Sequence, residues 1–300
     1  MTAPNTPPSA AGGRIVVATD LSEAAQLAVE RGARLARALG AELSLLHVFN
    51  DGLWATLTQL YDAKHWQGKE PALAAREQLS RLAAELAARH GLPVKAETLT
   101  GRAAATIAAH VVECKARLLV VGEHGESWIG DTVVGGTAQK ALKLSGVPVL
   151  LVRRPASADY RRLIVATDFS ACAERAARLA RELFPAAERL LLHAYAVAFE
   201  GRMRLAGAHD ADIERYRAAE RRRAEARLQE FAAQCGQACD WRFLLEYGSP
   251  AAVICEQALQ HQADLVVIGR HGGSEVEERF LGSVTQNVLY NAPCDVLLSP

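Results

Sequence analysis

The decisive stretch of the sequence is Asp264-Leu265-Val266-Val267-Ile268-Gly269-Arg270-His271-Gly272, followed after nine residues by Gly282-Ser283. A short apolar run ends at the first glycine, and apolar residues at helical spacing follow the serine. This order predicts a buried strand, a glycine loop and the start of a helix. Single glycines after a strand often only turn the chain. Three of them with a serine favour a loop whose N–H groups bind phosphate beside a helix N-terminus.

The glycine spacing excludes two common phosphate-binding motifs. No Gly-Lys-Ser or Gly-Lys-Thr occurs, so the loop is not a P-loop. Nine residues separate the second and third glycines, which is too many for the compact dinucleotide fingerprint.

Composition indicates a soluble globular protein with no charge bias. Of 300 residues, 34 are Lys or Arg and 34 are Asp or Glu, so nucleic acid and anionic membranes are not expected partners. The length suits two domains, and no apolar run is long enough to cross a bilayer. Residues 1–13 are expected to be a disordered tail without signal-peptide character, which favours a cytoplasmic protein.

The cysteine pattern predicts free thiols and no metal site. Among the six cysteines only Cys235 and Cys239 lie close together in the sequence, and no second pair of cysteines or histidines completes a zinc pattern. Such thiols are typical of a reducing compartment.

The chain consists of two copies of one unit. The segment from Arg14 to Ser22 returns from Arg162 to Ser170, and the glycine loop returns as Gly122 and Gly125 with Gly135. The order of the matching segments is kept and their offset barely drifts, so each copy has the size of one domain. The expected parts are a tail at 1–13, a first domain at 14–154, a linker at 155–160 and a second domain at 161–300.

Each copy alternates β-type and helical patterns, which predicts an α/β fold with a doubly wound parallel sheet. Ligands of such sheets bind beyond the carboxyl ends of the strands. Strands of the first copy are predicted at 15–19, 42–49, 94–99, 117–121 and 148–152, and helices at 22–39, 71–90, 103–114 and 132–144.

Together these features resemble the universal stress protein family, over nearly the whole chain and twice. The residues that carry the resemblance are Ala-Thr-Asp-x-Ser after strand one, Leu-Leu-His in strand two, the Gly-x-x-Gly-(nine residues)-Gly-Ser loop and the final Pro-Val-Leu-Leu-Val strand. The resemblance implies a tandem member with five-stranded sheets of order 3-2-1-4-5 and an adenine nucleotide alpha hydrolase-like fold. It also implies ATP binding where the glycine signature is complete. Similar proteins dimerise through the last strand, so the two copies are expected to pair within one chain, with a homodimer left open.

The resemblance assigns the ligand contacts as follows. Asp168 and the backbone of Ala194 would contact the adenosine part of ATP, bound alone or with Mg²⁺. Gly269, Gly272 and Gly282 would bind the phosphates through backbone N–H groups, and Ser283 would bind the terminal phosphates. The same motifs add Ala166, Thr167, Arg270 and Val284, and the corresponding weaker set in the first copy is Asp20, Val48, Gly122, Gly125 and Gly135.

The two glycine loops differ, which predicts tighter ATP binding in the second copy. Gly136 stands where Ser283 stands, and Thr137 comes one place late, which turns its side chain by about 100° on a helix. Carboxylates near a triphosphate repel it by about 1 kcal/mol per close pair in water, unless they point to solvent. The first loop carries Glu123, Glu126 and Asp131 without Lys or Arg, while the second carries Glu275, Glu277 and Glu278 with Arg270 and Arg279.

Other polar residues have simpler interpretations. Asp20 and Asp168 are equally well explained as helix-cap residues with Ser22 and Ser170. The histidines His47 and His193 are expected in the core or at the sheet rim, and His124 and His271 in the loops. The charged helix at 210–234 is expected to be a solvated face, with a partner or RNA surface as the alternative. Residues 54–69 and 199–209 are expected to be loops that lie over the nucleotide.

The sequence thus favours a nucleotide-responsive regulatory protein. No residue is an obvious base for activating water, so no catalytic residue is expected. A slow ATPase or self-phosphorylation at Ser283 is the enzyme alternative. A nucleotidyl-transfer enzyme lacks its histidine signature here, and a nucleotide-free scaffold acting through dimer surfaces is the remaining alternative.

Overall fold

The computed structural model divides the chain into two compact units, Met1–Asp159 and Tyr160–Pro300. The structure describes residues 12–50, 71–123, 135–196, 200–236, 240–272 and 281–300. Most of the predicted tail and the predicted loop at 54–69 lie outside the described residues. Gly12 and Gly13 are described, and the Gly13 carbonyl accepts a hydrogen bond from the Glu42 N–H.

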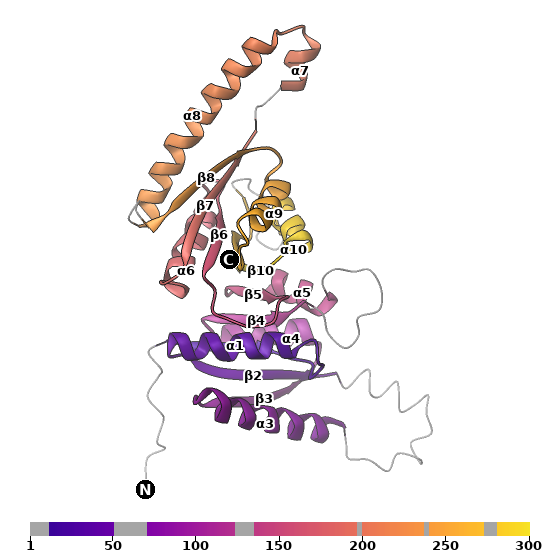
Figure 1. Ribbon diagram of the computed structural model, residues 1–300. Helices are drawn as coiled ribbons and strands as arrows, with labels where there is room; N and C mark the ends of the chain where they lie inside the picture. Colours follow the sequence, from indigo (N-terminus) through magenta and orange to yellow (C-terminus); the bar gives the residue numbers. More distant parts are fainter. Residues whose placement is uncertain (1–11, 51–70, 124–134, 197–199, 237–239, 273–280) are drawn as a thin grey trace, which may run out of the picture. The chain divides into compact units, whose positions relative to one another are not determined.

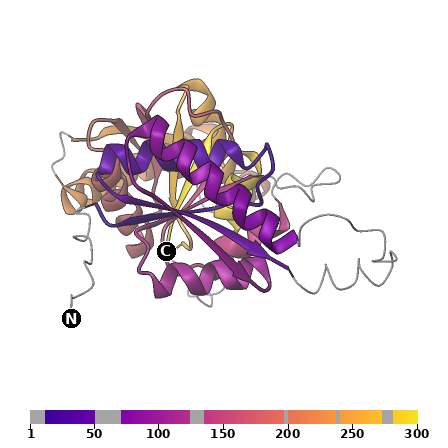
Figure 2. The ribbon, with the colours of Figure 1, turned by 90° about the horizontal axis from the view of Figure 1, so that it is seen from below.

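The first unit is a five-stranded parallel sheet of order β3-β2-β1-β4-β5. Helices α1 and α3 pack together on one face, and α4 and α5 pack together on the other (Figure 2). The elements are β1 (Arg14–Ala18), α1 (Gln26–Leu39), β2 (Glu42–Phe49), α3 (Pro71–His90), β3 (Val94–Thr100), α4 (Ala103–Glu113), β4 (Leu118–Gly122), α5 (Gly136–Leu144) and β5 (Val149–Val152).

The second unit repeats this order as β8-β7-β6-β9-β10, again all parallel. Helices α6 and α8 contact each other, as do α9 and α10 on the other side of the strands (Figure 1). The elements are β6 (Arg162–Ala166), α6 (Ala171–Leu183), β7 (Glu188–Tyr195), α7 (Glu200–Leu205), α8 (Asp210–Cys235), β8 (Arg242–Tyr247), α9 (Pro250–Gln260), β9 (Leu265–Gly269), α10 (Ser283–Asn291) and β10 (Asp295–Ser299).

The predicted fold class and strand order are confirmed. Both faces of each sheet are covered by helices, which explains why the inner strands read as continuous apolar runs. Every residue of β9 and of β10 is buried. The central strands β1, β4, β6 and β9 therefore form rigid supports whose carboxyl ends share one edge in each unit.

The strand-to-helix turn after β1 and β6 has the same backbone geometry in both units. Leu21 and Phe169 adopt left-handed conformations, with φ of 69° and 67°. Their N–H groups donate to the Thr19 and Thr167 hydroxyls at 3.0 and 2.9 Å. A left-handed side-chain-bearing residue costs about 1–2 kcal/mol. Helix α1 begins at Gln26 and not at the predicted Ser22, whereas α6 begins at Ala171, directly after the same turn.

The segment after β7 was predicted as a loop, but residues 200–205 form helix α7. Glu200 explains the difference because it joins α7 to two other elements. Its carboxylate accepts hydrogen bonds from Arg217 of α8 at 3.1 Å and from the Tyr247 hydroxyl at the end of β8 at 2.8 Å. The predicted solvated face of α8 is confirmed in its ion pairs, such as exposed Arg221 with Glu225 four residues later.

The Glu200 cluster predicts an acid-sensitive contribution to stability. Hydrogen bonds from Arg217, then from Tyr247, lower the pKa of Glu200 from 4.5 to about 2. A carboxyl whose folded-state pKa is lowered stabilises the fold above its unfolded pKa, and this stabilisation is lost as pH falls from there to the folded pKa. We expect Glu200→Gln to lower the free energy of unfolding at pH 7 and the difference from wild type to vanish between pH 4.5 and about 2.

Urea unfolding followed by circular dichroism measures this difference at each pH. Glu230→Gln is the control, because Glu230 lies exposed on the same helix α8. Equal stability of Glu200→Gln and wild type at pH 7 would contradict the anchoring role of Glu200.

Candidate functional site

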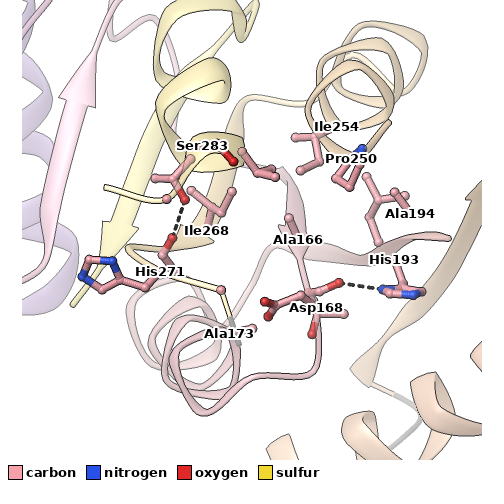
Figure 3. Close-up of a pocket in the computed structure, with 17 residues that line it drawn as sticks. Ala166, Asp168, Ala173, His193, Ala194, Pro250, Ile254, Ile268, His271 and Ser283 are labelled. Atoms are coloured by element: carbon pink, nitrogen blue, oxygen red, sulfur yellow. Dashed lines mark hydrogen bonds between the residues drawn. The ribbon is translucent and has the colours of Figure 1, made fainter. Parts of the chain in front are cut away.

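A cavity of about 280 Å³ lies at the carboxyl ends of β6, β7 and β9 in the second unit (Figure 3). This is where a doubly wound sheet binds its ligands. Most of the residues predicted for the second copy meet here. They are Ala166, Thr167, Asp168, Ala194, Gly269, Gly272, Gly282, Ser283 and Val284.

His193 forms one wall of this cavity, beside Ala194. Its Nδ1 lies 2.8 Å from the Thr167 carbonyl oxygen (Figure 3), so Nδ1 carries the proton and donates. Burial lowers the pKa of His193, and the positive charge of Arg227 lowers it further. His193 is therefore neutral near pH 7, and the expectation of a histidine at the sheet rim is confirmed.

The turn at Phe169 is held against helix α8. The Phe169 ring packs on the His193 ring with centroids 4.2 Å apart and meets Phe231 of α8 edge-on at 5.8 Å. The guanidinium of Arg227 lies 4.3 Å above the Phe169 ring centre. These contacts offset the cost of the left-handed backbone at Phe169 and fix the position of Asp168 beside it.

Asp168 shares its carboxylate between the turn and the cavity. Its Oδ1 accepts a hydrogen bond from the Ser170 N–H at 3.1 Å, while the Ser170 hydroxyl caps α6 by accepting from the Ala173 N–H. Its Oδ2 lies 2.7 Å from the point where a Cβ on Gly272 would stand. Asp168 is therefore both a turn residue and a residue that lines the cavity, and the two interpretations are compatible.

Backbone hydrogen bonds bring the two ends of the glycine loop together. The Arg270 N–H donates to the Ser299 carbonyl at 2.8 Å, and the Gly282 N–H donates to the Arg270 carbonyl at 3.0 Å. Helix α10 starts directly after Gly282 and has no side-chain cap. Its first N–H groups have no partner within the helix and carry the positive end of the helix dipole.

The three glycines serve different purposes. A Cβ on Gly269 would stand 2.8 Å from the Cys172 Sγ and 3.0 Å from its backbone carbon. A Cβ on Gly272 would meet the Asp168 carboxylate, as described above. A Cβ on Gly282 would have its nearest neighbour at 3.6 Å, so the protein itself tolerates a side chain there.

Arg270 is the predicted residue of this set that does not line the cavity. Its side chain is buried, and burial lowers its pKa. The backbone of Arg270 joins the loop ends, so its contribution to the site is structural. The loop acids Glu275, Glu277 and Glu278, together with Arg279, lie outside the described residues.

The sequence prediction missed the apolar part of the cavity. Pro250 and Ile254 stand four residues apart, so they share one face of the first turn of α9. The sequence pattern that could have predicted them is the spacing of apolar residues in a helix that directly follows a strand. The other cavity residues absent from the predicted contacts are Ala173, Leu192, His193, Ile268, His271 and Thr285.

The first unit repeats the turn but changes the loop. His47 Nδ1 lies 2.9 Å from the Thr19 carbonyl, and the Asp20 Oδ1 accepts from the Ser22 N–H and hydroxyl at 3.1 and 2.6 Å. Val48 and Gly122 lie at the ends of β2 and β4, and the Gly135 N–H donates to the Glu123 carbonyl at 2.7 Å. Four residues of the first loop that the sequence analysis named lie outside the described part of the chain: His124, Gly125, Glu126 and Asp131.

The prediction that Glu123 is an uncompensated charge is wrong. Glu123 Oε1 lies 2.7 Å from Arg153 Nε at the end of β5, and both side chains are mostly buried. Arg153 lies 30 residues away in the sequence and outside the loop, so the loop sequence alone gave no signal of the pair. The loop charges therefore give weaker support to the predicted difference in ATP affinity between the two copies. The other basis of that prediction remains, because Gly136 stands in the first copy where Ser283 stands in the second.

The fold defines a doubly wound α/β protein with a cavity at the carboxyl edge of its second sheet. The universal stress protein family matches residues 13–153 and again residues 159–300. The chain therefore belongs to this family, as two tandem domains.

Relatives match one domain at a time. A universal stress protein of Bacillus subtilis is 35% identical over 147 residues, 47% of this chain and 98% of that protein. One from Thermus aquaticus is 36% identical over 143 residues, 46% of this chain and 98% of its own.

Solved structures extend the likeness to the whole chain. A universal stress protein from Archaeoglobus fulgidus has a TM-score of 0.69 at 21% identity, covering 95% of this chain and 97% of its own. At this identity the likeness shows the fold alone. A universal stress protein solved in complex with cAMP has a TM-score of 0.36 at 23% identity, over 47% of this chain and 96% of its own, too slight to bear on the ligand here.

The described part of the chain lacks two kinds of feature. It contains no helix both long and apolar enough to span a membrane. It also contains no group of three or more His, Cys, Asp or Glu side chains placed to hold a metal ion.

The glycine geometry predicts that two alanine substitutions change the free energy of unfolding by different amounts. Gly269→Ala pushes its Cβ against the backbone of α6 at Cys172, so we expect a loss of about 1–3 kcal/mol in the free energy of unfolding, as for overpacked cores. Gly282→Ala meets only ordinary contacts, so we expect a change within about 0.5 kcal/mol. Chemical unfolding of the ligand-free variants measures both, and equal losses would contradict this assignment.

Proposed function

We propose that the second domain binds ATP in this cavity and that the protein is a nucleotide-responsive stress or regulatory protein. One observation carries the proposal: the cavity joins a glycine loop and an uncapped helix N-terminus to an apolar wall. Such a cavity suits a ligand with an anionic tail and a flat apolar base.

The phosphates would bind at the α10 end of the cavity. Ser283 is the first residue of α10, and its hydroxyl and the N–H groups of the first turn are suitable donors to an anion. Gly282 supports this assignment because the protein leaves space for a side chain there, and a ligand lying close to its backbone would use that space.

The adenosine part would bind at the opposite end, beside Asp168 and the backbone of Ala194. Pro250, Ile254 and Leu192 provide the apolar surface that a base needs. A carboxylate such as that of Asp168 accepts hydrogen bonds from ribose hydroxyls.

Asp168 also affects whether ATP would bind alone or with Mg²⁺. It is the one carboxylate among the described residues that line the cavity, and it lies against Gly272 of the glycine loop. A carboxylate close to a phosphate repels it by about 1 kcal/mol in water. Binding of ATP as its Mg²⁺ complex would offset this repulsion.

The first domain would bind nucleotide weakly or not at all. Gly136 replaces the serine hydroxyl, while the pair of Glu123 with Arg153 occupies the position where the second domain has Arg270. The predicted contacts of the first domain at Asp20, Val48, Gly122, Gly125 and Gly135 remain proposals on this basis.

Two further proposals rest on the family resemblance: pairing of the two domains through β5 and β10, and formation of a homodimer. Location in the cytoplasm, expected from the composition of the sequence, also remains a proposal. Slow ATP hydrolysis ranks below simple binding. The Nδ1 proton of His193 is donated to Thr167, so the titratable groups among the described lining residues are Asp168, His193 through its Nε2, and His271.

Removal of the phosphate donors tests the proposal directly. We expect ATP to co-purify with the gently isolated wild-type protein and to be lost from the Ser283→Ala, Gly282→Val double variant. A hydrogen bond to a charged group is worth about 1.5–3 kcal/mol, so Ser283→Ala alone should weaken ATP binding by roughly 10- to 100-fold. Mass spectrometry of the bound nucleotide and equilibrium titration measure the two effects.

Gly135→Val in the first domain is the matched control, because Gly135 precedes α5 as Gly282 precedes α10. It should leave the retained ATP unchanged. Wild-type protein without nucleotide affinity would favour the scaffold alternative, and equal losses in Gly135→Val would contradict the asymmetry. Steady phosphate release that disappears in Ser283→Ala would favour the ATPase alternative.

A further inference from the structure

Thr285 differs from the other polar residues of the cavity because its hydroxyl is bonded to the glycine loop itself. Thr285 is the third residue of α10 and is buried. Its Oγ1 donates a hydrogen bond to the Gly269 carbonyl at 2.9 Å, which crosses from the helix back to the end of β9.

This bond completes a set of three that fix the base of the loop. The peptide unit between Gly269 and Arg270 is held at both ends, since its carbonyl accepts from Thr285 and its N–H donates to Ser299. The next carbonyl, that of Arg270, accepts from the Gly282 N–H. A peptide plane bonded on both sides cannot rotate without breaking a buried hydrogen bond.

Among its described residues, the first domain shows two of these three bonds. The Glu123 N–H donates to the Val152 carbonyl at 3.0 Å, and the Gly135 N–H donates to the Glu123 carbonyl at 2.7 Å. The position of Thr285 is taken there by Ala138, the third residue of α5, which has no hydroxyl. The two domains therefore differ at the loop base as well as at Ser283.

We infer that Thr285 is a positioning residue for the phosphate end of the site, an inference that rests on the proposed function. Its hydroxyl holds the Gly269 carbonyl toward α10, so that the carbonyl lone pairs are directed at a donor and not at an incoming anion. The amides of Arg270 and Gly282 at the base of the loop therefore keep one orientation before the ligand arrives.

Thr285→Val removes the hydroxyl and nearly keeps the shape, whereas Thr285→Ser keeps the hydroxyl. In the ligand-free protein we expect Thr285→Val to speed amide hydrogen exchange at Arg270 and Gly282 by about fivefold, the equivalent of one net hydrogen bond. Glu123 and Gly135 of the first domain are the internal control and should keep their rates. Thr285→Ser should restore the exchange rates of the second domain.

Ligand titrations separate positioning from general stability. ATP affinity should fall about five- to tenfold in Thr285→Val while adenosine affinity is kept, because only the phosphates touch the loop. Equal losses for ATP and adenosine, or unchanged exchange and ATP affinity, would overturn the inference. Wild-type protein that binds ATP no better than adenosine would instead refute the proposed phosphate site, whatever Thr285→Val does to the exchange rates.

Discussion

The hydrogen bond from the Gly282 N–H to the Arg270 carbonyl is the constraint on which the site depends. It joins the end of β9 to the start of α10 across the intervening loop, so three glycines and Ser283 meet at one edge of the sheet. The sheet supplies the rigid support, because β9 is buried throughout and pairs on both sides. Without this closure the glycines would be ordinary turn residues, and α10 would present its N-terminus elsewhere.

The duplication separates features that both copies share from features confined to one copy. Both domains keep the left-handed residue after the first strand, the histidine that donates to the carbonyl of the threonine following that strand, and the bond that closes the loop. These features stabilise the turn and loop in any copy. The hydroxyls of Ser283 and Thr285 occur in the second domain alone, where Gly136 and Ala138 stand in the first. A feature that the fold does not need, placed in the cavity of one copy, is best explained by a ligand.

The sequence was sufficient for the fold because its signals are local. Strand β2 and helix α3 begin and end at the predicted residues, and the left-handed glycines Gly40 and Gly91 mark helix ends. The sequence motifs also predicted about half of the residues that line the cavity. Helix α7, the pair of Glu123 with Arg153 and the Thr285 hydrogen bond were not predictable in the same way. Each depends on a partner brought close by the tertiary fold, at a distance in the sequence that no periodicity encodes.

The number of ATP molecules bound per chain tests the central claim most directly. Isothermal titration of the nucleotide-free, full-length protein with Mg-ATP measures it without any substitution. The account predicts one high-affinity site per chain, with binding in the first domain weaker or absent. Two equal sites would contradict the assignment of the ligand to the second domain, and no binding would contradict the nucleotide site itself.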